Sequence, residues 1–275
     1  MHIANSSLAT RKSYVRGVKA LILHYNKLPE ECTIHEVKAF LVYCRDKLHY
    51  SASTTNLRVC SLKYYFREVV HRLDLVVKIP NPRIQKYDTE VLSFDEVKVL
   101  FKSCQNIRQL LVLHLLYDVG LRVREVVRLR PTDFDKQFQS ITIRNSKGNK
   151  TRVVQYGQVL RHTLNQYYRV RGGLPKECLI DSIVVKDKEQ PISKRGIQHI
   201  VRQVVKRSGL KKKISPHTLR HTYAVHFLNF GGTLPQLQQL LGHEYLSTTL
   251  HYLKYAVLPD SQTISPLDKL KEYEH

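Results

Sequence analysis

Long apolar runs are missing from this 275-residue sequence. The richest run, residues 110–116, is interrupted by His114 and ends before Gly120, whereas a membrane-spanning helix needs about 20 mostly apolar residues. The opening residues, MHIANSSLATRKSY, contain basic residues with no apolar segment behind them, a pattern that does not support a secretory signal. We therefore expect a cytoplasmic protein that does not cross a membrane.

Paired cysteines are missing as well. The five cysteines are scattered without a C-x-x-C pair, at Cys32, Cys44, Cys60, Cys104 and Cys178. This odd and dispersed set predicts neither disulfide bonds nor a zinc site. His217 and His221 stand four residues apart, with His226 nearby, but the segment H-T-L-R-H lacks the glutamate of a zinc-protease helix. We expect no bound metal here.

Acidic residues are scarce relative to basic ones. The chain has 45 lysines and arginines against 23 aspartates and glutamates, a formal net charge of +22 at pH 7. This positive field favours a polyanionic partner, and nucleic acid is the leading one. A ribosomal protein, a membrane-surface protein or a well-solvated basic protein would show the same excess, so composition alone leaves these classes open.

The first eighty residues are patterned as helices, with no convincing strand. Apolar residues recur at helical spacing over residues 7–25. Thr33 and Glu36 have the spacing of a capping box, which predicts a second helix from there through Val42. This part of the chain should therefore form a small helical bundle.

A third helix is predicted to open at Ser53 or Thr54. Lys63 and Arg67 fall outside its apolar stripe, and Arg58 lies at the edge of the stripe. The stripe itself contains Val59, Leu62, Phe66, Val69, Val70 and Leu73. We expect the three basic side chains to form an outer face that binds DNA phosphates.

The segment 79–88 marks a domain boundary, because its two prolines forbid regular hydrogen bonding and its polar residues bury little surface. We expect a helical domain over residues 1–82 and a linker over residues 83–92. A second domain should cover residues 93–275, opening with another capping box at Ser93.

The second domain combines helices with a small sheet. Residues 107–119 are apolar on nearly all sides, which is typical of a helix enclosed by its neighbours. Residues 140–144 and 151–156 are short β-branched runs joined by a turn signal, and they predict a hairpin to which residues 183–186 add a third strand. Three further capped helices follow. The chain should thus be mainly α with a small antiparallel β-sheet.

Four separated motifs in this domain carry the functional signal. G-L-R-x-x-E alone or L-G-H alone would be common by chance, but all four in order form a specific combination. They are Gly120-Leu-Arg122-Val-Arg-Glu125, the hairpin Lys147-Gly-Asn-Lys150, His217-Thr-Leu-Arg220, and Leu241-Gly-His243 followed nine residues later by Tyr252. Over residues 93–256 the chain resembles the tyrosine recombinase or phage integrase family, particularly its Xer-like and integron-like members. Residues 1–90 resemble that family's core-binding domain only in being helical and basic.

The arginines of these motifs suit phosphodiester chemistry. Negative charge builds on the non-bridging oxygens when an oxygen nucleophile attacks a phosphodiester, so fixed cations around them speed the reaction. Arginine is planar, always charged and able to donate two hydrogen bonds to one phosphate. We assign this role to Arg122 and Arg220. The alternative for Arg122 is a solvated helix-start arginine like Arg124.

Two histidines join them. His217 lies three residues before Arg220, so on a helix both side chains can address one phosphate. It could bind a phosphate oxygen or take the proton of the nucleophile, and a packed or helix-capping histidine is the alternative. His243 matches the second histidine of the family, and the resemblance implies that it hydrogen-bonds the phosphate.

Tyr252 is the nucleophile that the resemblance implies. A free phenol has a pKa of about 10, so it attacks only when a base and nearby cations favour phenolate. Tyr245 and Tyr255 are rivals by sequence, and the nine-residue interval from His243 favours Tyr252.

A lysine at the hairpin tip can protonate the leaving 5′ oxygen. Lys147 matches the position of this general acid in the family. Lys150 is the rival, and a contact with DNA backbone phosphate is its other expected role. Because arginine, lysine and histidine supply all the positive charge, we expect neither metal nor other cofactor.

The sequence therefore predicts a site-specific DNA recombinase or integrase that works through a 3′-phosphotyrosine intermediate. The resemblance implies a double-stranded DNA recombination site and a homo-tetramer on that DNA as partners. A type IB topoisomerase-like enzyme and a catalytically inactive DNA-binding regulator are the alternatives. The interval from L-G-H to tyrosine argues against the first, and a correctly spaced Tyr252 argues against the second.

Overall fold

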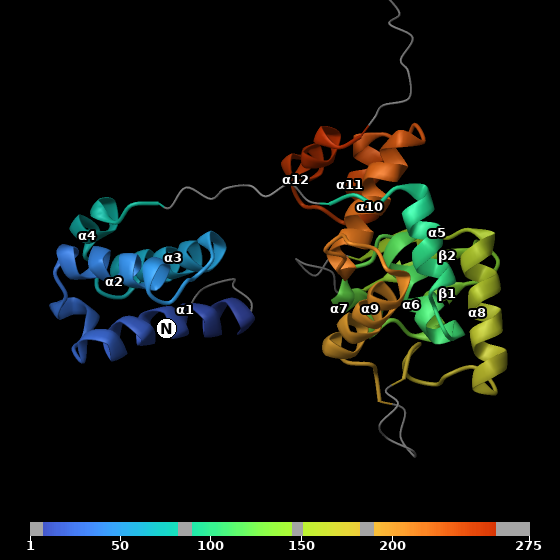
Figure 1. The fold of residues 1–275 in the computed structure, drawn as a ribbon, viewed down its shortest axis with the longest axis horizontal. Coiled ribbons are helices and arrows are strands. Elements are labelled where there is room, and N and C mark those ends of the chain that lie inside the picture. The colour runs from blue at the N-terminus through green and yellow to red at the C-terminus, as the bar shows by residue number, and fades with distance from the viewer. Residues whose placement is uncertain (1–7, 82–89, 145–150, 182–189, 257–275) are drawn as a thin grey trace, which may run out of the picture. The chain divides into compact units, whose positions relative to one another are not determined.

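The computed structural model describes residues 8–81, 90–144, 151–181 and 190–256. The chain divides into two compact units, Met1–Asp88 and Thr89–His275 (Figure 1). Each unit buries a hydrophobic core of its own. Within the described ranges, no helix is long and apolar enough to cross a lipid bilayer.

The described part of the first unit, residues 8–81, contains helices and no strand. Its core is built around Phe40, Leu62 and Phe66, which are at most 2% exposed, and α3 packs against both α1 and α2. The elements are α1 (Leu8–Tyr25), the 3-10 turn η1 (Pro29–Glu31), α2 (Ile34–Asp46), α3 (Ala52–Glu68) and α4 (Leu73–Lys78). The predicted capping box of Thr33 and Glu36 is confirmed at the start of α2, which runs four residues beyond the expected end.

The prediction for the third helix was wrong at both ends. Ser51 caps α3 through a hydrogen bond to the backbone of Thr54, so the helix begins before the expected position. It ends at Glu68 because the chain reverses at His71, whose φ is +57°, a left-handed conformation that interrupts a helix. The supposed stripe residue Leu73 is 60% exposed and opens α4 instead.

The second unit is built around one buried helix, α6. The central α6 contacts α8, α9 and α10, and its residues Leu111 to Leu116 are almost fully enclosed. The helices are α5 (Phe94–Lys102), α6 (Ile107–Tyr117), α7 (Val123–Arg128), α8 (Gln158–Arg171), α9 (Lys194–Ser208), α10 (Pro216–Asn229), α11 (Leu234–Leu241) and α12 (Leu246–Leu250), with the 3-10 turns η2 (Pro131–Asp133) and η3 (His251–Lys254). The predicted capping box at Ser93 is confirmed at the start of α5.

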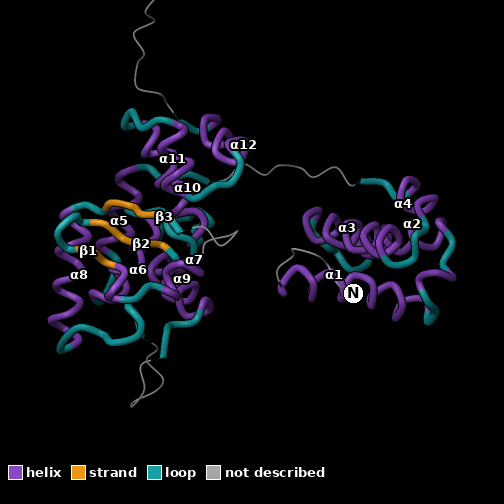
Figure 2. The backbone as a smooth tube through the Cα atoms, turned by 180° about the vertical axis from the view of Figure 1, so that it is seen from behind, coloured by secondary structure: helices purple, strands orange, loops and turns teal. Residues whose placement is uncertain are grey.

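The sheet has the antiparallel order β1-β2-β3 (Figure 2). Strands β2 (Ser140–Ile143) and β3 (Arg152–Gln155) form the expected hairpin, with Ile141 opposite Val154. The strand expected at residues 183–186 lies outside the described residues. The described third strand is β1 (Phe134–Asp135), which pairs with β2 and which the sequence analysis missed. The predicted fold class, mainly α with a small antiparallel sheet, is confirmed.

Candidate active site

Arg122 is the N-cap residue of α7, and it follows the short turn after the buried α6. Gly120 turns the chain between the two helices with φ +60°, which glycine adopts without strain, and a Cβ there would collide with the Tyr223 ring. The Arg122 guanidinium donates from Nη1 to Glu125 Oε1 at 3.0 Å and from Nη2 to the Gly242 carbonyl at 3.3 Å. A quarter of the side chain remains exposed (25%), so it can still meet a ligand.

His217 and Arg220 come from the first turns of α10, which Ser215 caps. Arg220 is 5% exposed. Its Nη2 donates to the Leu241 carbonyl at 2.8 Å and its Nη1 donates to the Gly120 carbonyl. His217, which lies three residues before Arg220 on the same helix, is exposed. Partial loss of solvent and the charges of Arg220 and Arg122 lower its pKa, so its imidazole is mostly neutral and able to accept a proton at neutral pH.

Glu125 connects the arginines from within. It is 6% exposed, accepts two hydrogen bonds from Arg152 at 2.8 and 2.9 Å, and lies 3.8 Å from Arg220 Nη1. Burial alone would raise its pKa, but the hydrogen bonds and charges of Arg152 and Arg122 outweigh burial and lower the pKa to about 2. Three cations therefore share one anion, and the cluster keeps an excess of positive charge.

Arg152 is a site residue that the sequence analysis missed. It is the first residue of β3, its side chain is 10% exposed, and its Nε donates to the Leu240 carbonyl at 2.8 Å. It thus connects the hairpin both to Glu125 and to the end of α11. Nothing in the local pattern separates it from the other basic residues of the hairpin, because its partner Glu125 lies 27 residues away.

His243 follows Gly242, which ends α11 in the left-handed conformation with φ +62°. Its Nε2 lies 3.3 Å from Arg220 Nη2, and its Nδ1 lies 3.0 Å from Thr249 Oγ1. Burial, followed by the charge of Arg220 and its neighbours, lowers the pKa of His243 to about 4. The imidazole is therefore neutral at physiological pH.

Tyr252 lies beside His243 and Arg220. It is 8% exposed, and its ring is nearly parallel to that of His243, with an interplanar angle of 11° and centroids 6.1 Å apart. Burial raises the pKa of Tyr252, while the charges of Arg220 and Arg122 and a hydrogen bond with Arg220 oppose the rise. The phenol consequently holds its proton in this structure, and the proton must leave during attack.

The two rival tyrosines have other surroundings. Tyr245 is 66% exposed just before α12. Tyr255 packs its ring against His221 and His251, with centroids 5.1 and 5.5 Å apart. Of the three tyrosines, Tyr252 is the one placed beside Arg220 in this structure.

The hairpin lysines Lys147 and Lys150 lie outside the described residues. The strands that flank them are described, and β3 begins with Arg152. Because Arg152 is held by Glu125, one end of the hairpin is anchored directly to the arginine cluster.

Three of the four residues expected to bind DNA, Arg58, Lys63 and Arg67, lie on α3, and the fourth, Lys150, lies outside the described residues. Lys63 hydrogen-bonds to Asn81 at 2.7 Å, and Arg67 is exposed and pairs with the glutamate that follows it. Arg58 is half-buried, with its guanidinium 5.6 Å from the centroid of the Tyr50 ring. Lys63 and Arg67 are therefore paired at the surface, and surface pairs are weak enough for these side chains to exchange their partners for DNA phosphates.

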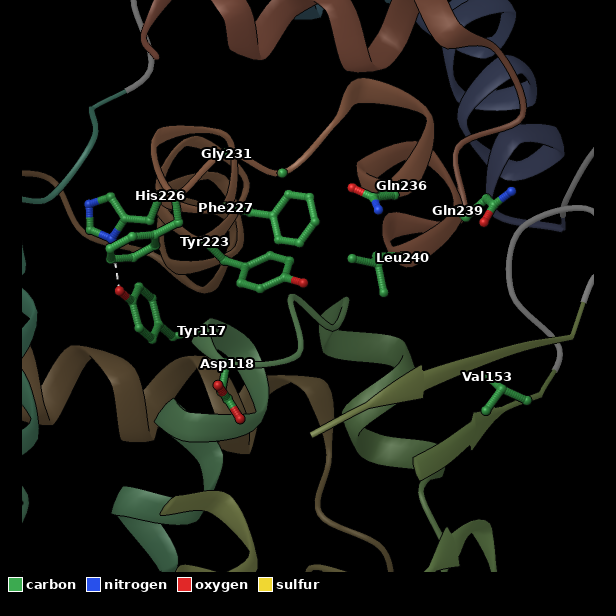
Figure 3. Close-up of a pocket in the computed structure, with 12 residues that line it drawn as sticks. Tyr117, Asp118, Val153, Tyr223, His226, Phe227, Gly231, Gln236, Gln239 and Leu240 are labelled. Atoms are coloured by element: carbon green, nitrogen blue, oxygen red, sulfur yellow. Dashed lines mark hydrogen bonds between the residues drawn. The ribbon is translucent and has the colours of Figure 1, made fainter. Parts of the chain in front are cut away.

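A pocket of about 710 Å³ lies between α10 and α11 (Figure 3). Tyr223 and Phe227 point into it, Asp118 lies on its wall, and the Tyr117 hydroxyl hydrogen-bonds to His226 Nδ1 at 2.8 Å. Its lining contains none of the predicted catalytic residues, so the arginine cluster forms a separate site. Within the ranges that the structure describes, no three His, Cys, Asp or Glu side chains gather as metal ligands.

Replacing Glu125 should weaken the whole cluster. Glu125→Gln should lower the free energy of unfolding by about 3–5 kcal/mol, because the buried arginines then lack their counter-charge. Glu125 has a lowered pKa in the folded state, so its contribution is complete above the ordinary carboxyl pKa of about 4.3 and is lost as pH falls towards about 2. Urea unfolding at several pH values measures both effects.

The matched control for Glu125→Gln is Asp95→Asn, which removes an acid that is 88% exposed and paired with Lys98. This variant should change little. Equal stability of the two variants would show that Glu125 does not hold the cluster together.

Both units match known protein families. The second unit matches the phage integrase family over residues 90–257, and the first matches the N-terminal SAM-like domain of phage integrases over residues 1–73. An integrase/recombinase named y4qK from Sinorhizobium fredii (strain NBRC 101917 / NGR234) is 30% identical over 272 residues, which cover 98% of this chain and 86% of that protein. The tyrosine recombinase XerC of Staphylococcus aureus (strain USA300 / TCH1516) is 35% identical over 181 residues, 64% of this chain and 60% of that protein.

Solved structures agree with these matches. The crystal structure of XerA recombinase is 27% identical with a TM-score of 0.56, and the match covers 98% of this chain and 93% of that one. A lambda integrase dimer bound to a COC′ core site shares the fold with a TM-score of 0.74 at 20% identity, over 91% of this chain and 90% of that one. The chain therefore belongs to the phage integrase family, and it is a tyrosine recombinase.

Proposed function

We propose that the chain cleaves and rejoins DNA through a 3′-phosphotyrosine at Tyr252, in a homo-tetrameric synapse on double-stranded recombination sites. The observation that carries this proposal is the position of Arg220. It lies against both His243 and Tyr252, while Glu125 ties it to Arg122. A phosphate bound at this point would meet cations on one side and the phenol on the other.

The arginines supply the charge that the reaction needs. As the Tyr252 oxygen attacks, negative charge grows on the two non-bridging oxygens, and Arg122 and Arg220 are already fixed to receive it. Their hydrogen bonds to backbone carbonyls and Glu125 hold them in place before DNA arrives. Little reorganisation is then required at the moment of reaction, which is the main advantage of a preorganised site.

Two proton transfers accompany the exchange of bonds. The bond from the Tyr252 oxygen to phosphorus forms while the bond from phosphorus to the 5′ oxygen breaks. The phenol proton passes to His217, which is neutral at physiological pH, and Lys147 gives a proton to the departing 5′ oxygen. Rejoining is the reverse reaction, with a 5′ hydroxyl of a partner strand attacking the phosphotyrosine.

Strand exchange between duplexes separates this function from the alternatives. A topoisomerase-like enzyme would reseal the strand that it cut, and an inactive regulator would cut nothing. Family membership favours exchange. A lambda integrase tetramer bound to a Holliday junction has the same fold, with a TM-score of 0.74, which supports the proposal of a tetrameric synapse for this chain.

A library of nicked duplexes with randomised central sequence tests the function without requiring a defined target site. The nick releases a short strand after cleavage, so the protein stays attached to its substrate. We expect covalent complexes that resist detergent, persist in excess EDTA, and contain duplexes with a shared sequence. Complexes that form only with added magnesium would contradict the proposal that arginine, lysine and histidine supply all the positive charge. The absence of any covalent complex would contradict the proposed reaction.

Salt dependence should reveal the role of α3. Each phosphate contact that is lost lowers the slope of log affinity against log salt by about 0.9. Lys63→Ala and Arg67→Ala should each reduce the slope by roughly this amount. The slope is measured on the selected duplex, which is the duplex with the shared sequence recovered from the library. Arg45→Ala is the matched control, because Arg45 lies on α2 and pairs with its neighbouring acid as Arg67 does. If all three variants kept the wild-type slope, the basic face of α3 would be only a solvated surface.

A further inference from the structure

The hydrogen bonds of His243 determine which of its nitrogens carries the proton. A guanidinium can donate hydrogen bonds but cannot accept them. Because Arg220 Nη2 lies 3.3 Å from His243 Nε2, Nε2 must be the unprotonated acceptor. The imidazole is neutral, so its single proton is on Nδ1 and is donated to Thr249 Oγ1 at 3.0 Å.

The reaction proposed above needs the opposite tautomer. A phosphate oxygen is an acceptor, so His243 can bind it only through a proton on Nε2. A doubly protonated imidazole would also serve, but Arg220, Arg122 and Arg152 oppose a further positive charge. The remaining solution is a neutral imidazole whose proton has moved from Nδ1 to Nε2, with Nδ1 then requiring a donor.

Thr249 can satisfy both forms. A hydroxyl has one proton and two lone pairs, and it can rotate. It accepts from Nδ1–H in the free protein and can turn to donate to a bare Nδ1. A backbone carbonyl or a carboxylate, which often orient histidines, could accept only. They would hold the proton on Nδ1 and leave a neutral His243 without a donor for phosphate.

The position of Thr249 matches this role. Its side chain is fully buried, with 0% exposure, so bulk water does not compete for its hydroxyl. It lies on the short α12, three residues before Tyr252. The hydroxyl therefore couples the state of His243 to the segment that carries the nucleophile.

We propose that Thr249 is a positioning residue whose hydroxyl allows neutral His243 to change tautomer when the scissile phosphate binds. This inference rests on the proposed function, because the phosphate is the ligand that demands the change. When phosphate arrives, Arg220 Nη2 exchanges Nε2 for a phosphate oxygen. The Nδ1–H bond breaks and an Nε2–H bond forms, with water carrying the proton, so the proton count of the imidazole is unchanged. The Thr249 hydroxyl rotates and keeps its own proton.

Two substitutions separate the hydroxyl from the shape of the side chain. Thr249→Ser keeps the hydroxyl, and Thr249→Val keeps the branched shape without it. In the full-length protein, Thr249→Val should slow cleavage of the selected nicked duplex by about 10- to 100-fold, the range for partners that orient metal-bound histidines in the same way. Thr249→Ser should stay close to wild type. In a His243→Gln background, Thr249→Val should cause no further loss, because its effect passes through His243.

Nitrogen-15 spectra of labelled histidines provide the readout that a merely structural role would not change. The His243 signals, identified by their loss in His243→Gln, should show a proton on Nδ1 in the free protein. They should show it on Nε2 when the Tyr252→Phe variant binds the selected duplex. The same tautomer in both states would overturn the proposal, as would a Thr249→Val variant that cleaves at the wild-type rate.

The proposed function is tested apart from this inference. If wild-type protein forms no covalent complex with any duplex, the proposed function fails, whatever the spectra show. If wild type reacts and Thr249→Ser is as slow as Thr249→Val, the function stands and the tautomer proposal fails. Loss of reaction from Thr249→Val in the His243→Gln background would likewise show that Thr249 acts only through packing.

Discussion

Tyr252→Phe should bind the selected duplex with unchanged affinity and form no covalent complex with it. The substitution removes only the phenol oxygen, which is the atom that attacks phosphorus in our proposal. The ring keeps its packing against His221 and His243, and binding depends on phosphate contacts made elsewhere. Mobility shifts measure the binding, and detergent-resistant complexes measure the reaction.

Tyr245→Phe and Tyr255→Phe are the matched controls for this variant. Each removes one phenol oxygen from the same segment, and both variants should still attach to DNA. Covalent attachment by Tyr252→Phe would show that another residue is the nucleophile. Loss of attachment in Tyr255→Phe alone would transfer the role to that tyrosine.

Lys147→Ala should be slow on normal DNA and largely recover on a duplex with a 5′-bridging phosphorothiolate. Sulfur leaves without needing a proton, so this substrate bypasses a missing general acid. Arg122→Ala should stay slow on both substrates, because the charge on the non-bridging oxygens still lacks its partner. The loss of one such donor costs about 2.7–4 kcal/mol, or roughly a hundred- to thousand-fold in rate. Single-turnover cleavage of the two substrates measures both effects.

Lys150→Ala is the control within the same hairpin. It should weaken DNA binding without a specific recovery on the phosphorothiolate. Equal recovery of Lys147→Ala and Arg122→Ala would remove Lys147 from the acid role. Recovery of Lys150→Ala alone would make Lys150 the acid.

Local chemistry explains why much of the helical framework could be predicted. The capping boxes at Thr33 and Ser93 are complete within four residues, so the sequence contains both hydrogen-bonding partners. Gly120 adopts its left-handed conformation three residues after α6 ends at Tyr117, a conformation that glycine favours locally. Spacing along α10 was enough to place His217 and Arg220 one turn apart on one helix. These features do not depend on distant residues.

Features that depend on distant partners escaped prediction. The end of α3 coincides with a left-handed His71, a conformation that few non-glycine residues adopt. Strand β1 has two residues and exists because β2 lies beside it. Arg152, on strand β3, gains its role from Glu125 in helix α7, and Thr249 gains its proposed role from the imidazole of His243. Residue type alone did not distinguish either side chain from its neighbours.

Peptide mapping of the trapped DNA adduct identifies both the nucleophile and the DNA end attached to it. The wild-type protein would be trapped on the selected nicked duplex, digested with protease and nuclease, and analysed by mass spectrometry. We predict a nucleotide joined through a 3′ phosphate to Tyr252. A nucleotide on any other residue, or one attached through a 5′ phosphate, would contradict it.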